Sequence, residues 1–215
     1  MDAVAVDGEL QFIPTTGLDP LSFLEVLAQW RRDGRTGWQY VPCAPGDAAG
    51  IPGPAATAPA INAGAALVGV DATPAVWVPA ADNAWREFTA ERHGSGLTET
   101  AAEAERHLLE QINDAVDTLT TLDVARWDGL DADVTTSATA VGGRPPTMEA
   151  RSVRLASRSA QVLHVVEVAI ADSGGARSAS ETQERAEALR SVERAARRAH
   201  AVAWNAGLGA SPSRR

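Results

Sequence analysis

Two His-x-x-Glu pairs have the spacing of metal ligands in this sequence. One pair is His107 and Glu110, and the other is His164 and Glu167. Two such pairs on facing helices would bring two imidazoles and two carboxylates together around a divalent metal. The second pair, however, lies in a segment rich in β-branched residues, and on a strand its two side chains point to opposite faces. The sequence therefore predicts no metal site and no cofactor.

The single cysteine, Cys43, is the candidate nucleophile. It lies between two prolines at the start of a segment rich in proline, glycine and alanine. A reactive cysteine needs a histidine, an arginine or a helix N-terminus beside it to stabilise the thiolate, and the sequence around Cys43 offers none. A small buried side chain is the favoured interpretation, and a small enzyme with its site at the Cys43 loop is the alternative.

Arginines near the C-terminus form the third candidate site. All 19 basic residues of the chain are arginines, which suit bidentate contact with carboxylates and phosphates. Two of them share a face of a predicted strand, and four lie on one side of the predicted C-terminal helix. Together these faces would bind nucleic acid, an anion or an acidic protein. Glutamates interleave with them, so a solvated helix face is the alternative. The candidate binding residues are Arg154, Arg158, Arg190, Arg194, Arg197 and Arg198.

Charge is distributed unevenly along the 215 residues. Residues 1–143 carry 7 Arg and 21 Asp or Glu, a net charge of −14, whereas residues 144–215 carry 12 Arg and 7 acids, a net charge of +5. The overall charge of −9 disfavours non-specific binding to nucleic acid. Oppositely charged ends favour docking within the chain, head-to-tail association with a second copy, or binding to another protein.

The first 95 residues predict an N-terminal lobe of mixed strands and helices. Asp7-Gly8 is typical of a tight hairpin turn, and Asp19-Pro20 is typical of a helix start, with Gly34 as its end. The composition of residues 42–64 predicts a long loop. The remaining expected elements are a hairpin over 3–13, strands over 38–41, 65–70 and 75–78, and a short helix over 82–92.

Residues 96–207 predict two long helices that flank a sheet. Thr100 and Glu103 form a capping box at the start of a helix over 98–126, and Ser180 and Gln183 form another at the start of a helix over 180–205. Between them, β-branched residues predict a three-stranded antiparallel meander. Its expected strands are 131–141, 149–157 and 161–171, and the tail 208–215 is expected to be disordered.

These elements predict an α+β fold in which antiparallel strands pack against a long central helix and a C-terminal helix. The sequence shows neither a signal peptide nor an apolar run of about 18 residues, which predicts a soluble, cytoplasmic protein without membrane contact. The favoured function is a non-catalytic interaction or assembly protein with charge-complementary surfaces. An enzyme at the Cys43 loop and a nucleic-acid or anion binder at the arginine face are the alternatives.

Overall fold

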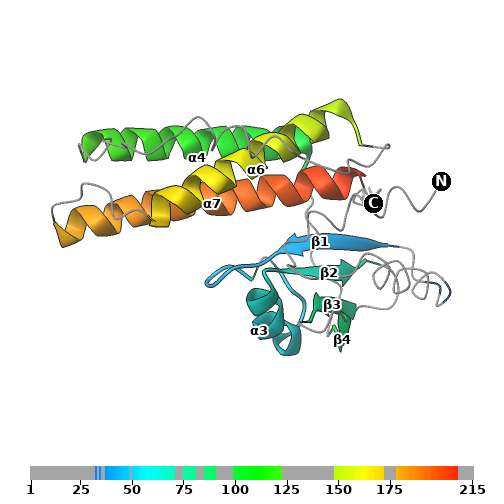
Figure 1. Ribbon diagram of the computed structural model, residues 1–215. Coiled ribbons are helices and arrows are strands. Elements are labelled where there is room, and N and C mark those ends of the chain that lie inside the picture. The colour runs from blue at the N-terminus through cyan, green and yellow to red at the C-terminus, as the bar shows by residue number, and fades with distance from the viewer. Residues whose placement is uncertain are drawn as a thin grey trace. The chain divides into compact units, whose positions relative to one another are not determined.

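The protein has an α+β fold, as the sequence predicts. The computed structural model describes residues 32, 34, 37–48, 50–70, 75–80, 85–90, 99–122, 148–171 and 178–207. Its strands and helices are shown in Figure 1. In chain order they are β1 (Trp38–Pro42), α3 (Pro54–Ala63), β2 (Ala65–Gly69), β3 (Ala75–Pro79), β4 (Trp85–Thr89), α4 (Ala101–Thr121), α6 (Ala150–Ala171) and α7 (Ala179–Gly207).

The chain divides into two compact units. The first, the sheet unit, comprises residues 1–98, 142–149 and 204–215, and the second, the bundle, comprises residues 99–141 and 150–203. The last residues of α7 therefore belong to the sheet unit. Of the sequence predictions, the hairpin over 3–13, the helix start at Asp19, the strand over 131–141 and the tail lie outside the described residues.

The sheet is an antiparallel meander in the order β1-β2-β3-β4. Tyr40 lies opposite Leu67, and Leu67 lies opposite Trp77 in the next strand. These three side chains are buried on one face, while the neighbouring residues on the other face, such as Val68 and Val76, join the core beneath α3. Because both faces of the central strands are covered, β2 has no polar residue (Ala65–Gly69). The strands expected over 38–41, 65–70 and 75–78 are confirmed.

Helix α3 lies within the segment 42–64 that the sequence predicts to be a loop, so that prediction is wrong for residues 54–63. Pro54 stands in the first turn of α3, where its missing N–H forfeits no helical hydrogen bond. Gly64 ends the helix with a φ of 79°, a left-handed conformation that favours glycine. Ala56 and Ala60 face the sheet and are fully buried. Pro54 and Gly64, which contributed to the loop prediction, therefore mark the two ends of a helix, and Pro59 lies within it.

The short helix expected over 82–92 is also wrong, because Trp85–Thr89 form strand β4. Phe88 lies opposite Val76 and packs on the core beneath α3. Arg86 and Glu87, on either side of the strand, are exposed. The strand preference of Trp, Phe and Thr and the pairing with β3 determine the structure here.

In the bundle, α4 begins as the sequence predicts. The Glu103 backbone N–H donates to Thr100 Oγ1 at 3.3 Å, and the Thr100 backbone N–H donates to Glu103 Oε2 at 2.8 Å. These contacts from Thr100 hold the pKa of Glu103 below its ordinary value, because they stabilise the carboxylate. The predicted capping box is confirmed.

Helix α6 occupies residues that the sequence assigns to two strands, 149–157 and 161–171, and that prediction is wrong. Leu155, Ser159, Val166 and Ala169 are buried along one side at helical spacing. Packing against the other two helices of the bundle therefore makes residues 150–171 helical, although their valines favour a strand. The strand prediction rested on the β-branched composition of these residues.

Helix α7 covers the predicted span 180–205, but its cap differs. Ser178 accepts from the Glu181 backbone N–H at 3.1 Å, and Glu181 Oε2 accepts from the Ser178 backbone N–H at 3.1 Å. The capping box is thus formed by Ser178 and Glu181, and the box expected from Ser180 and Gln183 is wrong. The C-terminal halves of α4 and α6 pack with the N-terminal half of α7 around a common core. This core consists of Ala115, Val166, Ala169, Leu189 and Val192.

Contacts along the bundle give the helix directions. Glu105 on α4 pairs with Arg151 near the start of α6, and Ala115 further along α4 packs with Val166. Arg185 near the start of α7 donates to the carbonyl of Ala169 near the end of α6 at 2.7 Å. Helices α4 and α6 are therefore parallel to each other and antiparallel to α7. Within the described residues, no helix has the length and apolar character needed to cross a membrane.

Candidate interaction surface

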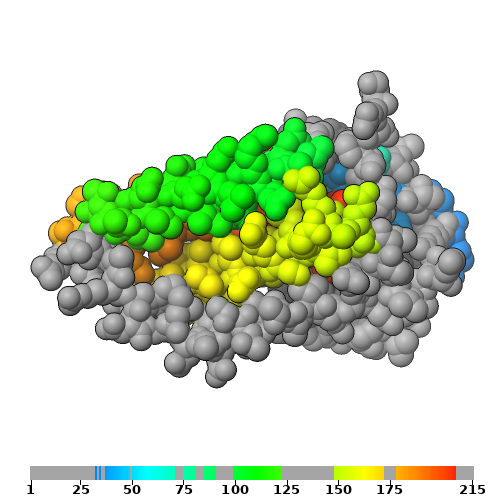
Figure 2. All heavy atoms as spheres, turned by 90° about the horizontal axis from the view of Figure 1, so that it is seen from above, coloured from blue at the N-terminus to red at the C-terminus, as the bar shows by residue number. Residues whose placement is uncertain are grey.

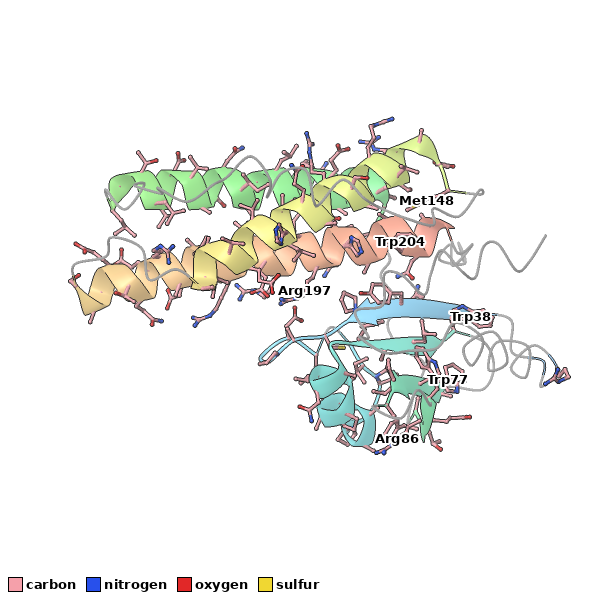
Figure 3. The ribbon with its side chains drawn as sticks, in the orientation of Figure 1. Trp38, Trp77, Arg86, Met148, Arg197 and Trp204 are labelled. Atoms are coloured by element: carbon pink, nitrogen blue, oxygen red, sulfur yellow. The ribbon has the colours of Figure 1, made fainter. Side chains whose placement is uncertain are left out.

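The six arginines predicted to bind a partner are divided among different environments. Arg158 Nη1 lies 3.6 Å from Glu105 Oε1, which also accepts, through Oε2, from Arg151 at 3.0 Å. Arg197, which is labelled in Figure 3, pairs with Glu193 one turn earlier on α7, and Arg198 pairs with Glu99. These three arginines therefore hold acidic residues of the bundle itself.

Arg154, Arg190 and Arg194 are exposed, and no described residue forms an ion pair with them. Arg154 lies on α6, one turn from Arg158 and on the flank that faces α4. Arg190 and Arg194 lie on α7, on the side away from its core residue Val192. The structure therefore spreads the predicted arginine face over two helices, and its role as a binding surface stays a prediction.

Both His-x-x-Glu pairs lie on helices of the bundle. His107 and Glu110 are on α4, and His164 and Glu167 are on α6, so the assignment of the second pair to a strand is wrong. Despite the helical placement, no group of three or more His, Cys, Asp or Glu side chains within the described residues is arranged to hold a metal ion.

Cys43 is a core residue of the sheet unit. It is 4% exposed and packs with Val41, Ile51 and Ala60 beneath α3. Its thiol lies 3.6 Å from the carbonyl oxygen of Val41, and its backbone N–H donates to Gly64 at 2.8 Å. This environment agrees with the interpretation of Cys43 as a small buried side chain, and a nucleophilic role would first require the site to open.

A buried Ser–His contact, which the sequence analysis did not single out, joins α6 to α7. Ser159 Oγ donates to the carbonyl of Leu155 at 2.8 Å and lies 3.2 Å from His200 Nδ1. Ser159 Oγ also lies 3.0 Å from the Ala156 carbonyl, and the imidazole tautomer decides which of the two side chains donates. Burial lowers the pKa of His200 to about 4, and a hydrogen bond with the Ala156 backbone opposes this shift only in part. The pair is a neutral, structural contact between helices.

Asn205 closes the edge of the sheet. Its side-chain Oδ1 accepts from the Tyr40 backbone N–H at 2.8 Å, and its Nδ2 donates to the Tyr40 carbonyl at 3.0 Å. Tyr40 lies on β1, an outer strand of the sheet, so the amide takes the place that a further strand would occupy. Sequence reasoning treated Asn205 only as the end of a helix, because nothing local signals a partner 165 residues away.

Replacing Asn205 by alanine is expected to lower the free energy of unfolding by about 2–4 kcal/mol, because both of these buried hydrogen bonds are lost. Chemical denaturation followed by tryptophan fluorescence measures the change. Asn113→Ala is the matched control, since Asn113 is exposed on α4 and its loss should alter stability by less than about 0.5 kcal/mol. Equal stabilities of the two variants would show that the Asn205 contacts do not hold the edge.

The side of α4 that faces away from the bundle core carries a regular pattern, which we call the outer seam. Its members recur at intervals of four and three residues, so they share one side of the helix. All are exposed, including the large apolar side chains Leu109 at 41% and Val116 at 54%. Figure 2 shows α4, in green, exposed along its length beside α6. The outer seam consists of Ala102, Arg106, Leu109, Asn113, Val116 and Thr120.

An acidic row flanks the outer seam. Glu103, Glu110 and Asp117 each directly follow an apolar residue of the seam, with a repeat of seven residues. All three are exposed, and Arg106 approaches Glu110 only at 3.9 Å. The signal was present in the sequence as Ala-Glu, Leu-Glu and Val-Asp at positions 102, 109 and 116. It was missed because Leu108 and Ile112, which face the core, satisfy the helical pattern on their own.

Comparison with known proteins gives a family for both halves of the chain. The N-terminal domain of Rv1486c-like protein matches residues 1–100, and the C-terminal domain of Rv1486c-like protein matches residues 102–201. No match was found among curated proteins or among solved structures. The border between the two matches falls immediately before α4, the first helix of the bundle. Because the two domains follow each other in order and together span nearly the whole chain, the protein belongs to the Rv1486c-like family.

Proposed function

We propose that this protein is a non-catalytic interaction protein and that the outer seam of α4 is its binding surface. The observation that carries the proposal is the combination of exposed Leu109 and Val116 with acidic neighbours at the same seven-residue repeat. Single exposed apolar residues are common on protein surfaces. A repeat that matches the spacing of helix–helix contacts is the pattern of a surface that another helix covers.

The ion pairs of the bundle support the same proposal. Glu105 binds Arg151 and Arg158, and Glu99 binds Arg198, so charge complementarity between the acidic and arginine-bearing helices is used to assemble the bundle. Glu110 and Asp117 of the acidic row are not part of these contacts between helices. Both carboxylates are exposed, and the ion pair of Glu110 with Arg106 lies within α4.

The buried reactive groups also favour binding over catalysis. Cys43 is enclosed beneath α3, and Ser159 and His200 are enclosed between α6 and α7. A substrate would have to displace core side chains to reach any of them, whereas Leu109 and Val116 are reached without rearrangement.

Site-specific photo-crosslinking in the organism that encodes the protein tests the proposal. A benzophenone amino acid at position 109 is expected to form a defined adduct with another protein chain. The same group at position 114 is the matched control, because Asp114 is exposed on α4 but lies outside the outer seam. Absence of an adduct from position 109, or equal adducts from both positions, would overturn the proposed function.

A further inference from the structure

We infer that the partner of the outer seam is a basic amphipathic α-helix of another protein. The inference rests on the proposed function and adds the chemistry of the partner. It is argued from three features of the described residues: the length and spacing of the seam, the sign of the flanking charges, and the composition of the chain's own exposed helix faces.

The spacing of the outer seam suits a straight helix. Ala102, Leu109 and Val116 are separated by seven residues each, so they repeat about every 10 Å along α4. A helix packed against them at a shallow crossing angle presents its own side chains with the same repeat. The seam runs from Ala102 to Thr120, nearly the full length of α4, so a partner helix of about five turns would cover it.

The acidic row determines the charge of the partner. Glu110 and Asp117 lie on the same flank of Leu109 and Val116, where the edge of a covering helix would lie. A second α4, packed antiparallel across a two-fold axis, would set this flank against its own copy and place carboxylates opposite carboxylates. Lysine or arginine on the partner would instead pair with them and gain affinity and orientation.

Among the residues that the structure describes, the exposed arginines do not supply such a helix. Arg190 and Arg194 lie on the outer side of α7, but Gln183 and Glu187 share that side and no large apolar side chain accompanies them. The other arginine of that side, Arg197, is paired with Glu193. Among the described residues of a second copy, the apolar strip of α4 is flanked by acids and the exposed arginines of α7 lack an apolar strip, which favours a different protein as the partner.

Synthetic helices test the inference with the full chain. The basic probe has three heptads with leucine at the first and fourth positions and arginine at the fifth and seventh. The acidic probe replaces these arginines by glutamate, and the scrambled probe keeps the basic composition without the leucine strip. Fluorescence anisotropy is expected to show at least about tenfold tighter binding of the basic probe than of either other peptide.

Charge reversal of the acidic row provides the decisive comparison. Glu110→Arg with Asp117→Arg is expected to reverse the preference, so that the acidic probe binds at least about tenfold more tightly than the basic one. Asp114→Arg with Glu167→Arg is the matched control, because it changes the net charge equally at exposed positions outside the seam and should leave the preference for the basic probe intact. Circular dichroism confirms that each variant is folded.

The inference is overturned if neither strip-bearing probe binds, if the scrambled probe binds as well as the basic one, or if charge reversal leaves the preference unchanged. It is also overturned if the photo-crosslink from position 109 joins two copies of this chain or captures a segment without a basic helix. In these last cases the proposed function stands and only the identity of the partner is wrong. Absence of any adduct from position 109 would instead overturn the proposed function itself.

Discussion

Replacing Trp77 by alanine is expected to lower the free energy of unfolding of the sheet unit by about 3–5 kcal/mol, because a large side chain is removed from a packed core. Trp77 lies on β3, as labelled in Figure 3, and is only 1% exposed. Chemical denaturation measures the loss. Arg86→Ala is the control, because Arg86 is exposed on the neighbouring strand β4, and it should change stability by less than about 0.5 kcal/mol.

The environment of Trp77 adds a second, coupled test. A Cβ atom at Gly69 would lie 3.3 Å from two atoms of the Trp77 indole ring, so glycine gives the ring its space. Gly69→Ala is therefore expected to destabilise the wild-type sheet by about 1 kcal/mol and to have a smaller effect once Trp77 is replaced by leucine. Additive effects of the two substitutions would contradict direct packing of the indole on Gly69.

Lowering the pH from 7 to 4 is expected to remove about 3 kcal/mol of stability from the bundle through His200 alone. The pKa of His200 is about 4 in the folded protein, against an ordinary value of 6.5. Between these values the unfolded chain binds a proton that the folded chain excludes, so stability falls as the pH decreases through this window. Above pH 6.5 the imidazole is neutral in both states, and the effect vanishes.

The measurement compares the pH dependence of the unfolding free energy in the wild type and in His200→Gln, which removes the titrating group. Their difference should shrink steadily from pH 6.5 to pH 4. His107→Gln is the matched control, because His107 is exposed on α4 and its loss should leave the slope unchanged. If His200→Gln does not fold, an NMR titration of the His200 imidazole in the wild type decides the matter. A midpoint near 6.5 would contradict the buried, neutral imidazole.

Local sequence patterns predicted some elements of the fold, whereas other elements depend on packing between distant residues. The capping box at Thr100 and Glu103 acts between residues three positions apart, so local pattern was sufficient to predict it. Three strands of the sheet unit, β1, β2 and β3, also followed from local composition, whereas β4 was predicted to be a helix. In contrast, α6 is rich in residues that prefer strands and becomes helical because Leu155, Ser159 and Val166 pack on neighbouring helices. The sequence alone does not reveal that packing.

The candidate binding surface could also be predicted only in part from the sequence. Charge complementarity was predicted, and Glu105 with its two arginines provides it inside the bundle. The sequence could not assign individual arginines to internal pairs or to the surface, because Glu99 and Arg198 are brought together only by folding. The outer seam was predictable in principle, since Leu109 and Val116 recur with their acidic neighbours. Recognising it required knowing that Leu108 faces the core and Leu109 does not.

The adjacent leucines Leu108 and Leu109 give the most direct test of the proposed binding surface. Leu108 is fully buried in the bundle, whereas Leu109 is exposed on the outer seam. A benzophenone amino acid placed at position 116 reports on partner binding, and its adduct yield is measured with and without Leu109→Ser. We expect the substitution to reduce the yield about tenfold while leaving the free energy of unfolding nearly unchanged. An unchanged yield from position 116 would contradict binding at the outer seam.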